Sequence, residues 1–123
     1  MSPDKEAYLF EKYARIFAPI EIRTDHRSSC MARGFECGDG WFDIIEEALQ
    51  KLCSLNEDVI VEQVKEKFGT MRFYLTGSEK AFEIEDEVEK KSESICEVCG
   101  KPGVLYPKGW MVTRCEKCHT KKI

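Results

Sequence analysis

The sequence predicts an α+β fold, in which a small domain of helices and one β-hairpin spans residues 1–94 and a zinc ribbon spans residues 95–123. Three observations support this prediction. Apolar residues recur at helical spacing in three segments, two short segments rich in β-branched and aromatic residues flank a glycine-containing turn, and two C-x2-C pairs lie near the carboxyl end. A chain of 123 residues has the length of one ordinary domain with a small appendage.

The first helix is expected to run from Ser2 and Pro3 to about Phe17. Ser2 is a suitable N-cap, and Pro3 suits the first helical position because a proline there loses no hydrogen bond. The apolar residues that follow would bury one broad face of the helix, and Pro19 helps to end it. The polar segment 21–37 shows no regular pattern, and no element is assigned to it.

The second helix is expected from about Trp41 to Leu55, after the chain-breaking GDG stretch. Asp39 is the expected N-cap, and Asp43 lies in the first turn, where the helix dipole favours an acid. The apolar positions recur at helical spacing and are Ile44, Ile45, Ala48, Leu49, Leu52 and Cys53. Cys53 is therefore expected in the core.

A β-hairpin is expected next, with strands at residues 59–64 and 71–75. Gly69, in the KEKFGT stretch between them, supplies the permissive backbone that a hairpin bulge needs. Ser78 then caps a third helix over residues 79–94. The apolar stripe of this helix consists of Ala81, Phe82, Ile84 and Val88.

The cysteines near the carboxyl end predict a metal site. Cys96 and Cys99 form one C-x2-C pair, and Cys115 and Cys118 form another after fifteen intervening residues. This spacing lies within the range typical of structural zinc, and four thiolates at about 2.3 Å satisfy tetrahedral Zn²⁺ with no open position. Gly100 would allow the left-handed backbone that the first cysteine knuckle favours.

The ribbon is expected to contain a short hairpin, in which residues 103–106 pair with residues 110–113 across a Pro-Lys-Gly turn and bring the cysteine pairs together. The ribbon is also basic. Residues 98–123 contain six Lys or Arg and one acid, whereas residues 79–97 contain eight acids and three lysines. A nucleic-acid contact would use Lys101, Lys108, Arg114, Lys117, Lys121 and Lys122.

Other interpretations of the cysteines remain open. The RCEKCH stretch also fits c-type haem attachment or a redox dithiol, but haem would leave the first pair unexplained and the sequence lacks the βαβ unit in which such dithiols usually lie. His119 is an alternative fourth ligand in place of Cys118. His26, Cys30 and Cys37 share one irregular segment and form an alternative second metal site, although they lack C-x2-C spacing.

Two further stretches are candidates for ligand binding. The GDGWF stretch offers an acid, Asp39, and a stacking indole, Trp41, at the start of a helix, although a tight turn with a capping aspartate and a core tryptophan is the favoured interpretation. The second stretch surrounds the hairpin, where alternation would send some polar side chains to a common face that grips an anionic ligand. Its residues are Lys65, Lys67, Arg72 and Tyr74.

Composition excludes several classes of function. The net charge of −4 argues against a general nucleic-acid binder, because neutralising phosphates requires a basic face. The amino-terminal stretch lacks a basic-then-apolar signal pattern, and no apolar run approaches the roughly 18 residues that span a membrane. A cytoplasmic location, where thiols stay reduced, is expected, and seven cysteines fit a disulfide framework poorly.

Three motifs in fixed order resemble a group of small proteins of unknown function from tailed phages, prophages and bacterial genomes. These motifs are FECGDGWFDII, VKEKFGTMRFYL, and ICEVCGKPGVL with GWMVTRC, and the resemblance covers roughly residues 34–118. Thr70 departs from the group, where a second glycine often follows the KEKFG stretch. The second cysteine pair varies in the group, with histidine sometimes in its place. The resemblance implies a phage-linked accessory role and supplies no biochemistry.

The leading hypothesis is a non-enzymatic, phage-type accessory protein that binds a bacterial host protein and inhibits or redirects it, with a component of antiviral defence as one candidate partner. This step is an analogy with other small phage proteins. One alternative is a sponge that sequesters an anionic nucleotide immune signal, and another is a zinc-ribbon protein that contacts nucleic acid. An enzyme is not predicted, because the sequence has no nucleophile–base motif and no phosphate-cradling loop, and a four-thiolate zinc site has no vacancy for substrate.

Overall fold

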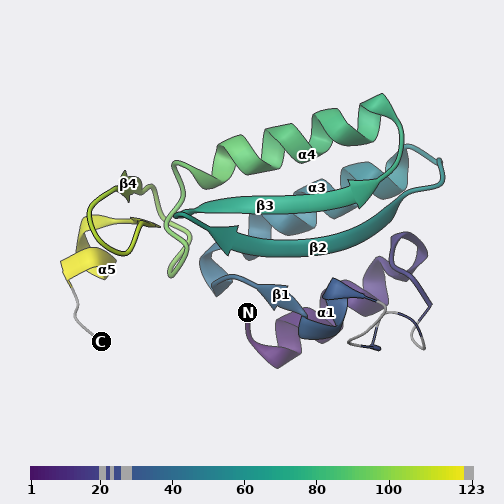
Figure 1. The fold of residues 1–123 in the computed structure, drawn as a ribbon, viewed down its shortest axis with the longest axis horizontal. Helices are drawn as coiled ribbons and strands as arrows, with labels where there is room; N and C mark the ends of the chain where they lie inside the picture. The colour runs from purple at the N-terminus through teal and green to yellow at the C-terminus, as the bar shows by residue number, and fades with distance from the viewer. Residues whose placement is uncertain (20–21, 23, 26–28, 121–123) are drawn as a thin grey trace.

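A three-stranded mixed sheet forms the centre of the molecule, two helices pack on one of its faces, and the cysteine-rich tail lies beyond one end (Figure 1). This computed structural model describes residues 1–19, 22, 24–25 and 29–120. The helices are α1 (Pro3–Lys12), α3 (Phe42–Ser54), α4 (Glu79–Ser92) and α5 (Glu116–Thr120), with short 3-10 helices η1 (Ala14–Ile16), η2 (Cys30–Arg33) and η3 (Asp39–Trp41). The strands are β1 (Phe35–Glu36), β2 (Ile60–Lys67), β3 (Thr70–Thr76), β4 (Val104–Tyr106) and β5 (Val112–Arg114). The predicted α+β class is confirmed.

The first helix is shorter than predicted. It begins after Ser2 as expected, but it ends at Lys12 rather than at about Phe17. Tyr13 leaves the helical conformation, with φ −113° and ψ 29°, and the chain tightens into η1. This change of direction lets both Ile16 and Phe17 be buried. Apolar residues recur at helical spacing through this bend, so hydrophobic spacing alone could not locate the end of the helix.

The second predicted helix is α3, and its predicted cap is wrong. The Asp39 side chain does not cap α3; its Oδ1 accepts a hydrogen bond from the backbone N–H of Ser2 at 2.8 Å and so ties the start of α1 to η3. The residues predicted to face the core and found buried are Ile44, Ile45, Ala48, Leu49 and Leu52. Cys53 is only half-buried and packs against the edge of the core.

Strands β2 and β3 form the predicted hairpin, but the connection is tighter than expected. Lys67 pairs with Thr70, so Phe68 and Gly69 alone make the turn, and both have positive φ, 53° and 86°. Two successive positive φ angles define the type I′ turn that matches the twist of a hairpin. The irregularity in register lies between Val61 and Gln63, within the strand, and the expected bulge at Gly69 is therefore wrong.

The third predicted helix is α4, which lies against β3. Ser78 caps it as predicted, because its Oγ accepts a hydrogen bond from the backbone N–H of Ala81. Ala81 and Val88 are buried, whereas Phe82 is 45% exposed, which contradicts its place in the predicted apolar stripe. Adjacent helical residues lie about 100° apart around the axis, so only one of Ala81 and Phe82 can face the sheet.

The outer edges of the three-stranded sheet are occupied by side chains of the helices. On β3, the backbone N–H of Phe73 donates to Glu89 Oε2 at 2.8 Å, and that of Met71 donates to Ser92 Oγ at 2.9 Å. On β1, the backbone N–H of Phe35 donates to Glu6 Oε2 at 2.6 Å. Covered edges cannot pair with a strand from another chain at these positions.

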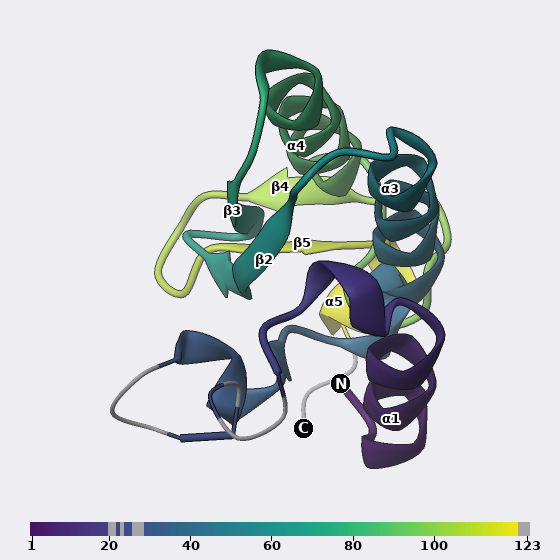
Figure 2. The ribbon, with the colours of Figure 1, turned by 90° about the vertical axis from the view of Figure 1, so that its right-hand side faces the viewer.

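The hydrophobic core lies between the sheet and the two helices on its face, and it continues toward α1 (Figure 2). The largest fully buried side chains include Trp41, Phe35, Phe73, Leu9, Leu49 and Met71. Within the described ranges, no helix has both the length and the apolar character needed to span a bilayer.

Candidate metal centre

The four cysteines predicted as ligands converge at one point. The Sγ atoms of Cys96, Cys99, Cys115 and Cys118 all lie within 4.8 Å of one another, and those of Cys99 and Cys115 are 3.6 Å apart. A disulfide would require about 2.05 Å. A tetrahedral ion with metal–sulfur bonds of about 2.3 Å separates its sulfurs by about 3.8 Å. The cluster therefore has the spacing of a four-thiolate metal site, and it could hold a metal ion.

The first cysteine pair lies in a tight knuckle after α4. The backbone N–H of Gly100 donates to the Cys96 carbonyl at 2.9 Å, and the Cys96 N–H donates to the Lys101 carbonyl at 2.7 Å. Gly100 has φ 82°, which is the left-handed conformation expected of it. Since this conformation is costly for a residue with a Cβ, glycine suits the position.

The second pair lies where β5 passes into α5. The backbone N–H of Cys118 donates to Cys115 Sγ at 3.4 Å, and the His119 N–H donates to the Cys115 carbonyl at 2.9 Å. Strands β4 and β5 pair as an antiparallel hairpin, with Leu105 opposite Thr113. The predicted ribbon hairpin is thus present, although its second strand begins at Val112 rather than Trp110.

His119 is not part of the cluster. Among the described residues, the only group of potential metal ligands is the set of four cysteines. The His119 ring instead stacks on Tyr106, with ring centroids 3.6 Å apart and planes inclined by 1°. The alternative in which histidine replaces Cys118 is therefore not favoured by the geometry.

Two thiols of the cluster, Cys96 and Cys118, have shifted pKa values. Burial raises the pKa of Cys96, but hydrogen bonds from backbone groups and from Cys99 outweigh it and lower the pKa to about 6. Hydrogen bonding to the Cys115 thiol and burial raise the pKa of Cys118 to about 12. Ionisation of the Cys96 thiol is thus favoured, and ionisation of the Cys118 thiol is disfavoured. A bound divalent cation would supply the compensation that four thiolates require.

The GDGWF stretch contacts the first cysteine knuckle. The backbone N–H of Gly40 donates to the Glu97 carbonyl at 2.8 Å, and the N–H of Gly38 donates to Glu97 Oε2 at 2.8 Å. A Cβ on Gly40 would lie 2.1 Å from the carbonyl oxygen of Cys96. The glycine is therefore required by the close approach of two backbones. Burial raises the pKa of the Glu97 carboxyl group. Glu97 was not among the residues that the sequence analysis singled out.

Trp41 belongs to the same contact and is not on an open surface. It is fully buried, and its indole Nε1–H donates to the Ile95 carbonyl at 2.8 Å. Asp39 binds the backbone of Ser2. The structure thus places both candidate ligand-binding residues of GDGWF in structural contacts. We call the contact between residues 38–41 and residues 95–100 the domain–ribbon interface.

The polar residues of the hairpin do share one face. Lys65 lies opposite Arg72, and residues two positions away on the same strands, Lys67 and Tyr74, point the same way. The intervening residues on β3 are buried, so this face is opposite to the core. Glu36 lies beside Lys65 in the parallel register of β1 and β2 and offsets part of the positive charge.

The proposed second metal site falls partly outside the described residues, because His26 lies there. Cys30 is exposed, whereas Cys37 is buried, and burial raises its pKa to about 12. Neither belongs to a group of three or more potential ligands in the described part of the chain. Cys37 behaves as a small core residue with an unreactive thiol.

The basic residues of the ribbon differ in exposure. Lys101, Lys108 and Lys117 are exposed, whereas Arg114 is half-buried. Lys121 and Lys122 lie outside the described residues.

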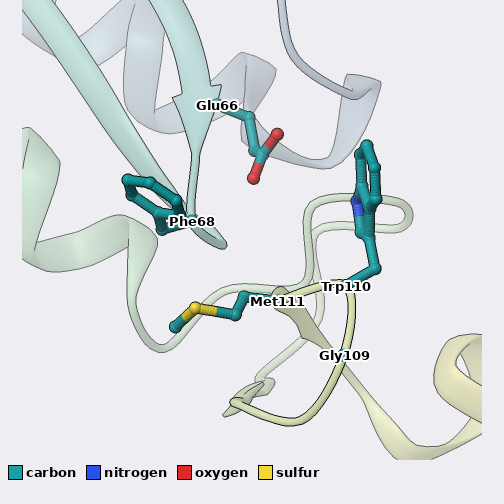
Figure 3. A pocket seen from close by; sticks show the side chains of 5 residues that line it. All are labelled: Glu66, Phe68, Gly109, Trp110 and Met111. Atoms are coloured by element: carbon teal, nitrogen blue, oxygen red, sulfur yellow. The ribbon is translucent and has the colours of Figure 1, made fainter.

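An exposed aromatic pair was missed by sequence reasoning. The turn of the β2–β3 hairpin, which we call the hairpin tip (Phe68 and Gly69), lies against the ribbon, where Thr113 Oγ1 donates to the Gly69 carbonyl at 2.6 Å. Beside it runs the ribbon loop, residues 107–111. Phe68 is 61% exposed and Trp110 is 83% exposed. Figure 3 shows both rings bordering a pocket of about 370 Å³, which is lined by Glu66, Phe68, Gly109, Trp110 and Met111.

Comparisons with protein-family models, with curated proteins and with solved structures found no match for this chain. The resemblance to phage-encoded proteins remains a prediction from motifs.

Proposed function

We propose that this chain is a non-enzymatic zinc-ribbon protein that binds a bacterial protein and inhibits or redirects it, as a phage-type accessory protein would. The observation that carries the proposal is the exposure of two large apolar side chains, Phe68 and Trp110, on opposite sides of one pocket (Figure 3). Aromatic residues are enriched at the centres of protein interfaces, and contiguous exposed apolar surface marks such sites.

Zinc is the metal that best fits the cluster, because four thiolates at tetrahedral spacing are a donor set of structural Zn²⁺ sites. Such a site has no open coordination position, so the ion would hold the ribbon together and would activate neither water nor substrate. Elemental analysis of freshly purified protein is expected to give about one zinc per chain, with the four thiols unreactive until a chelator is added. Substoichiometric zinc with freely reactive thiols would contradict this assignment.

The scaffold supports binding by side chains rather than by strand addition. Glu6, Glu89 and Ser92 occupy backbone donors on the outer edges of the three-stranded sheet. The hairpin tip is fixed to the ribbon through the buried hydrogen bond between Thr113 and Gly69. A rigid support lowers the entropic cost of presenting two aromatic rings to a partner.

The proposal is tested by affinity purification from a bacterial lysate with three forms of the full chain. Wild type and Phe82→Ala are expected to retain one protein partner in stoichiometric amount, and Trp110→Ala is expected to lose it. Phe82 is a matched control because it is also an exposed aromatic residue, but it lies on α4, at the end far from the ribbon (Figure 1).

Each outcome separates one part of the proposal. Absence of any stoichiometric partner with wild type would count against the binding function. A partner that all three forms retain would place the binding surface elsewhere. A partner that is lost only with Trp110→Ala should be purified. Its activity should fall or change when the chain is added.

A second candidate function is the sequestration of an anionic nucleotide. It is favoured by the shared face of Lys65, Lys67, Arg72 and Tyr74, which offers three cations and one ring. Trp41 takes no part, since it is buried. Thermal shift against cyclic and linear nucleotides is the test, because a ligand at a hundredfold excess over its Kd stabilises a protein by about 2.7 kcal/mol. No shift with any nucleotide would end this candidate.

A further inference from the structure

The conformation of Phe68 is unfavourable for its residue type. Phe68 occupies the first central position of a type I′ turn with φ 53°, where asparagine, aspartate or glycine is the usual choice. Its ring is 61% exposed, so the chain gains little burial in return. A strained residue that contributes little to packing points to a role outside the fold.

Trp110 faces the same pocket from the other side. It lies in the ribbon loop, 83% exposed, and the neighbouring Met111 lines the pocket below it (Figure 3). Gly109 precedes it with φ 67° and sets the direction of the loop. Two rings supplied by separate elements thus border one hollow of about 370 Å³, which has room for a single long side chain.

The polar group of the pocket is the Glu66 carboxylate. Its Oε2 accepts a hydrogen bond from the backbone N–H of Gly69 at 2.7 Å, which fixes the carboxylate at the mouth between the rings (Figure 3). In the described part of the chain, no cation forms a salt bridge with Glu66. Lys67 Nζ lies 5.6 Å from the centroid of the Phe68 ring, so this ring already attracts a cation of its own chain.

We propose that the pocket bordered by Phe68, Glu66 and Trp110 receives an arginine side chain of the partner protein. The guanidinium is planar, stacks on aromatic faces and pairs with a carboxylate through two hydrogen bonds, while its apolar stem would lie along Met111. This inference rests on the proposed binding function and specifies the chemistry of its partner.

The first test uses three blocked tripeptides, acetyl-Gly-X-Gly-amide, in which X is arginine, citrulline or leucine. Citrulline keeps the shape of arginine without its charge. In ¹H–¹⁵N NMR spectra of the zinc-loaded chain, the arginine peptide is expected to shift the indole signal of Trp110 saturably, with the signal of buried Trp41 as an internal control. Citrulline and leucine peptides should bind about tenfold more weakly. Equal binding of all three, or no saturable shift with arginine, would overturn the proposal.

Two variants separate this role from a structural one. Glu66→Gln keeps an oxygen that can accept from Gly69, and it should remove the preference for arginine over citrulline. Phe68→Asn replaces the strained residue with one that suits the turn, so Tm should stay equal or rise while arginine binding falls about tenfold. A large fall in Tm with unchanged binding would show that Phe68 serves the fold and would overturn the inference.

The two proposals can fail separately. A lysate partner that is lost with Trp110→Ala, but is not displaced by the arginine tripeptide, would leave the binding function standing and remove the arginine assignment. Arginine-selective binding of the tripeptides without any lysate partner would leave the pocket's preference for arginine standing and would remove the proposed binding function.

Discussion

The amino-terminal domain and the ribbon are stabilised by different means. The domain surrounds a continuous core that includes Phe35, Leu49 and Phe73, each at most 1% exposed. Among the described residues of the ribbon, only Cys96, Val112 and Thr113 are buried. A segment of this size cannot bury enough apolar surface to offset its conformational entropy, so it depends on a cross-link or a metal. A metal ion bound by the four cysteines would stabilise the ribbon, whereas hydrophobic burial stabilises the domain.

The two regions nevertheless form one rigid contact. Trp41 reaches from the domain to the Ile95 carbonyl, and Thr113 reaches from the ribbon to the Gly69 carbonyl. These hydrogen bonds are buried or partly buried, and a buried carbonyl left without a donor costs about 1–3 kcal/mol. Loss of the ribbon would therefore also weaken the domain at the hairpin tip and at the domain–ribbon interface.

The largest effect is expected from removing one metal ligand. Structural zinc contributes about 10–16 kcal/mol in isolated zinc-finger peptides, so Cys99→Ser should unfold the ribbon. Hydrogen exchange should then show lost amide protection at residues 95–120, while residues 60–76 of the β2–β3 hairpin remain protected. Zinc content should fall in parallel.

Cys30→Ser is the matched control, because Cys30 is an exposed thiol outside the cluster. It should change neither zinc content nor exchange. If Cys99→Ser left the amides of the ribbon protected, the contrast between a metal-dependent and a core-dependent region would be wrong.

Truncating a core side chain is expected to have a smaller effect, which is confined to the amino-terminal domain. Phe73 is fully buried on β3, and truncating a buried phenylalanine typically costs about 3–5 kcal/mol. Phe73→Ala should lower the urea midpoint accordingly, with zinc content unchanged in native buffer. The neighbouring residue provides the control, since Tyr74 is 42% exposed on the opposite face and Tyr74→Ala should change stability by much less. Equal effects of the two substitutions would contradict the assigned faces of the sheet.

The sequence predicted those features that depend on local pattern. The spacing of the cysteines located the cluster, and Gly100 was assigned its left-handed backbone from its position after Cys99. Hydrophobic spacing located α3, and the residues Gly77-Ser78 located the start of α4. Each of these signals lies within a few residues of the feature that it predicts.

The features that were missed depend on contacts between distant residues. Strand β1 has two residues, too few for any periodicity, and exists because Phe35 pairs with Val64. Asp39 looked like a helix cap but binds Ser2, 37 residues away. The aromatic pair arises because the β2–β3 turn and the ribbon loop meet in space. Its one local signal was a phenylalanine directly before glycine in a hairpin turn.

The interface between the two regions is tested by Gly40→Ala. The added Cβ would lie 2.1 Å from the Cys96 carbonyl oxygen and 2.6 Å from that of Glu97. Backbone atoms on both sides would have to shift, and overpacking of this kind typically costs about 1–3 kcal/mol. Both the urea midpoint of the domain and the zinc affinity should fall, because the interface joins the regions.

Gly109→Ala is the control: its Cβ would meet nothing within 4 Å, so only the strain at φ 67° remains. A Gly40→Ala chain with unchanged zinc affinity would show that the regions are independent.

The smallest effect concerns a charge on α4, remote from the cysteines in sequence. Burial, reinforced by the nearby charges of Glu89 and Asp86, raises the pKa of Glu85 from 4.5 to about 7. Between these values the folded chain binds the proton more tightly than the unfolded chain, so this group's contribution to stability falls as pH rises from about 4.5 to about 7. Glu85→Gln cannot ionise, and it should exceed wild type in Tm at pH 8 and match it near pH 5. Because Glu85 is partly exposed, the gain should stay below about 1 kcal/mol.

Comparing variant with wild type at each pH cancels the loss of zinc in acid, which both chains share. A constant difference across this range would show that the carboxylate of Glu85 is solvated in the folded domain.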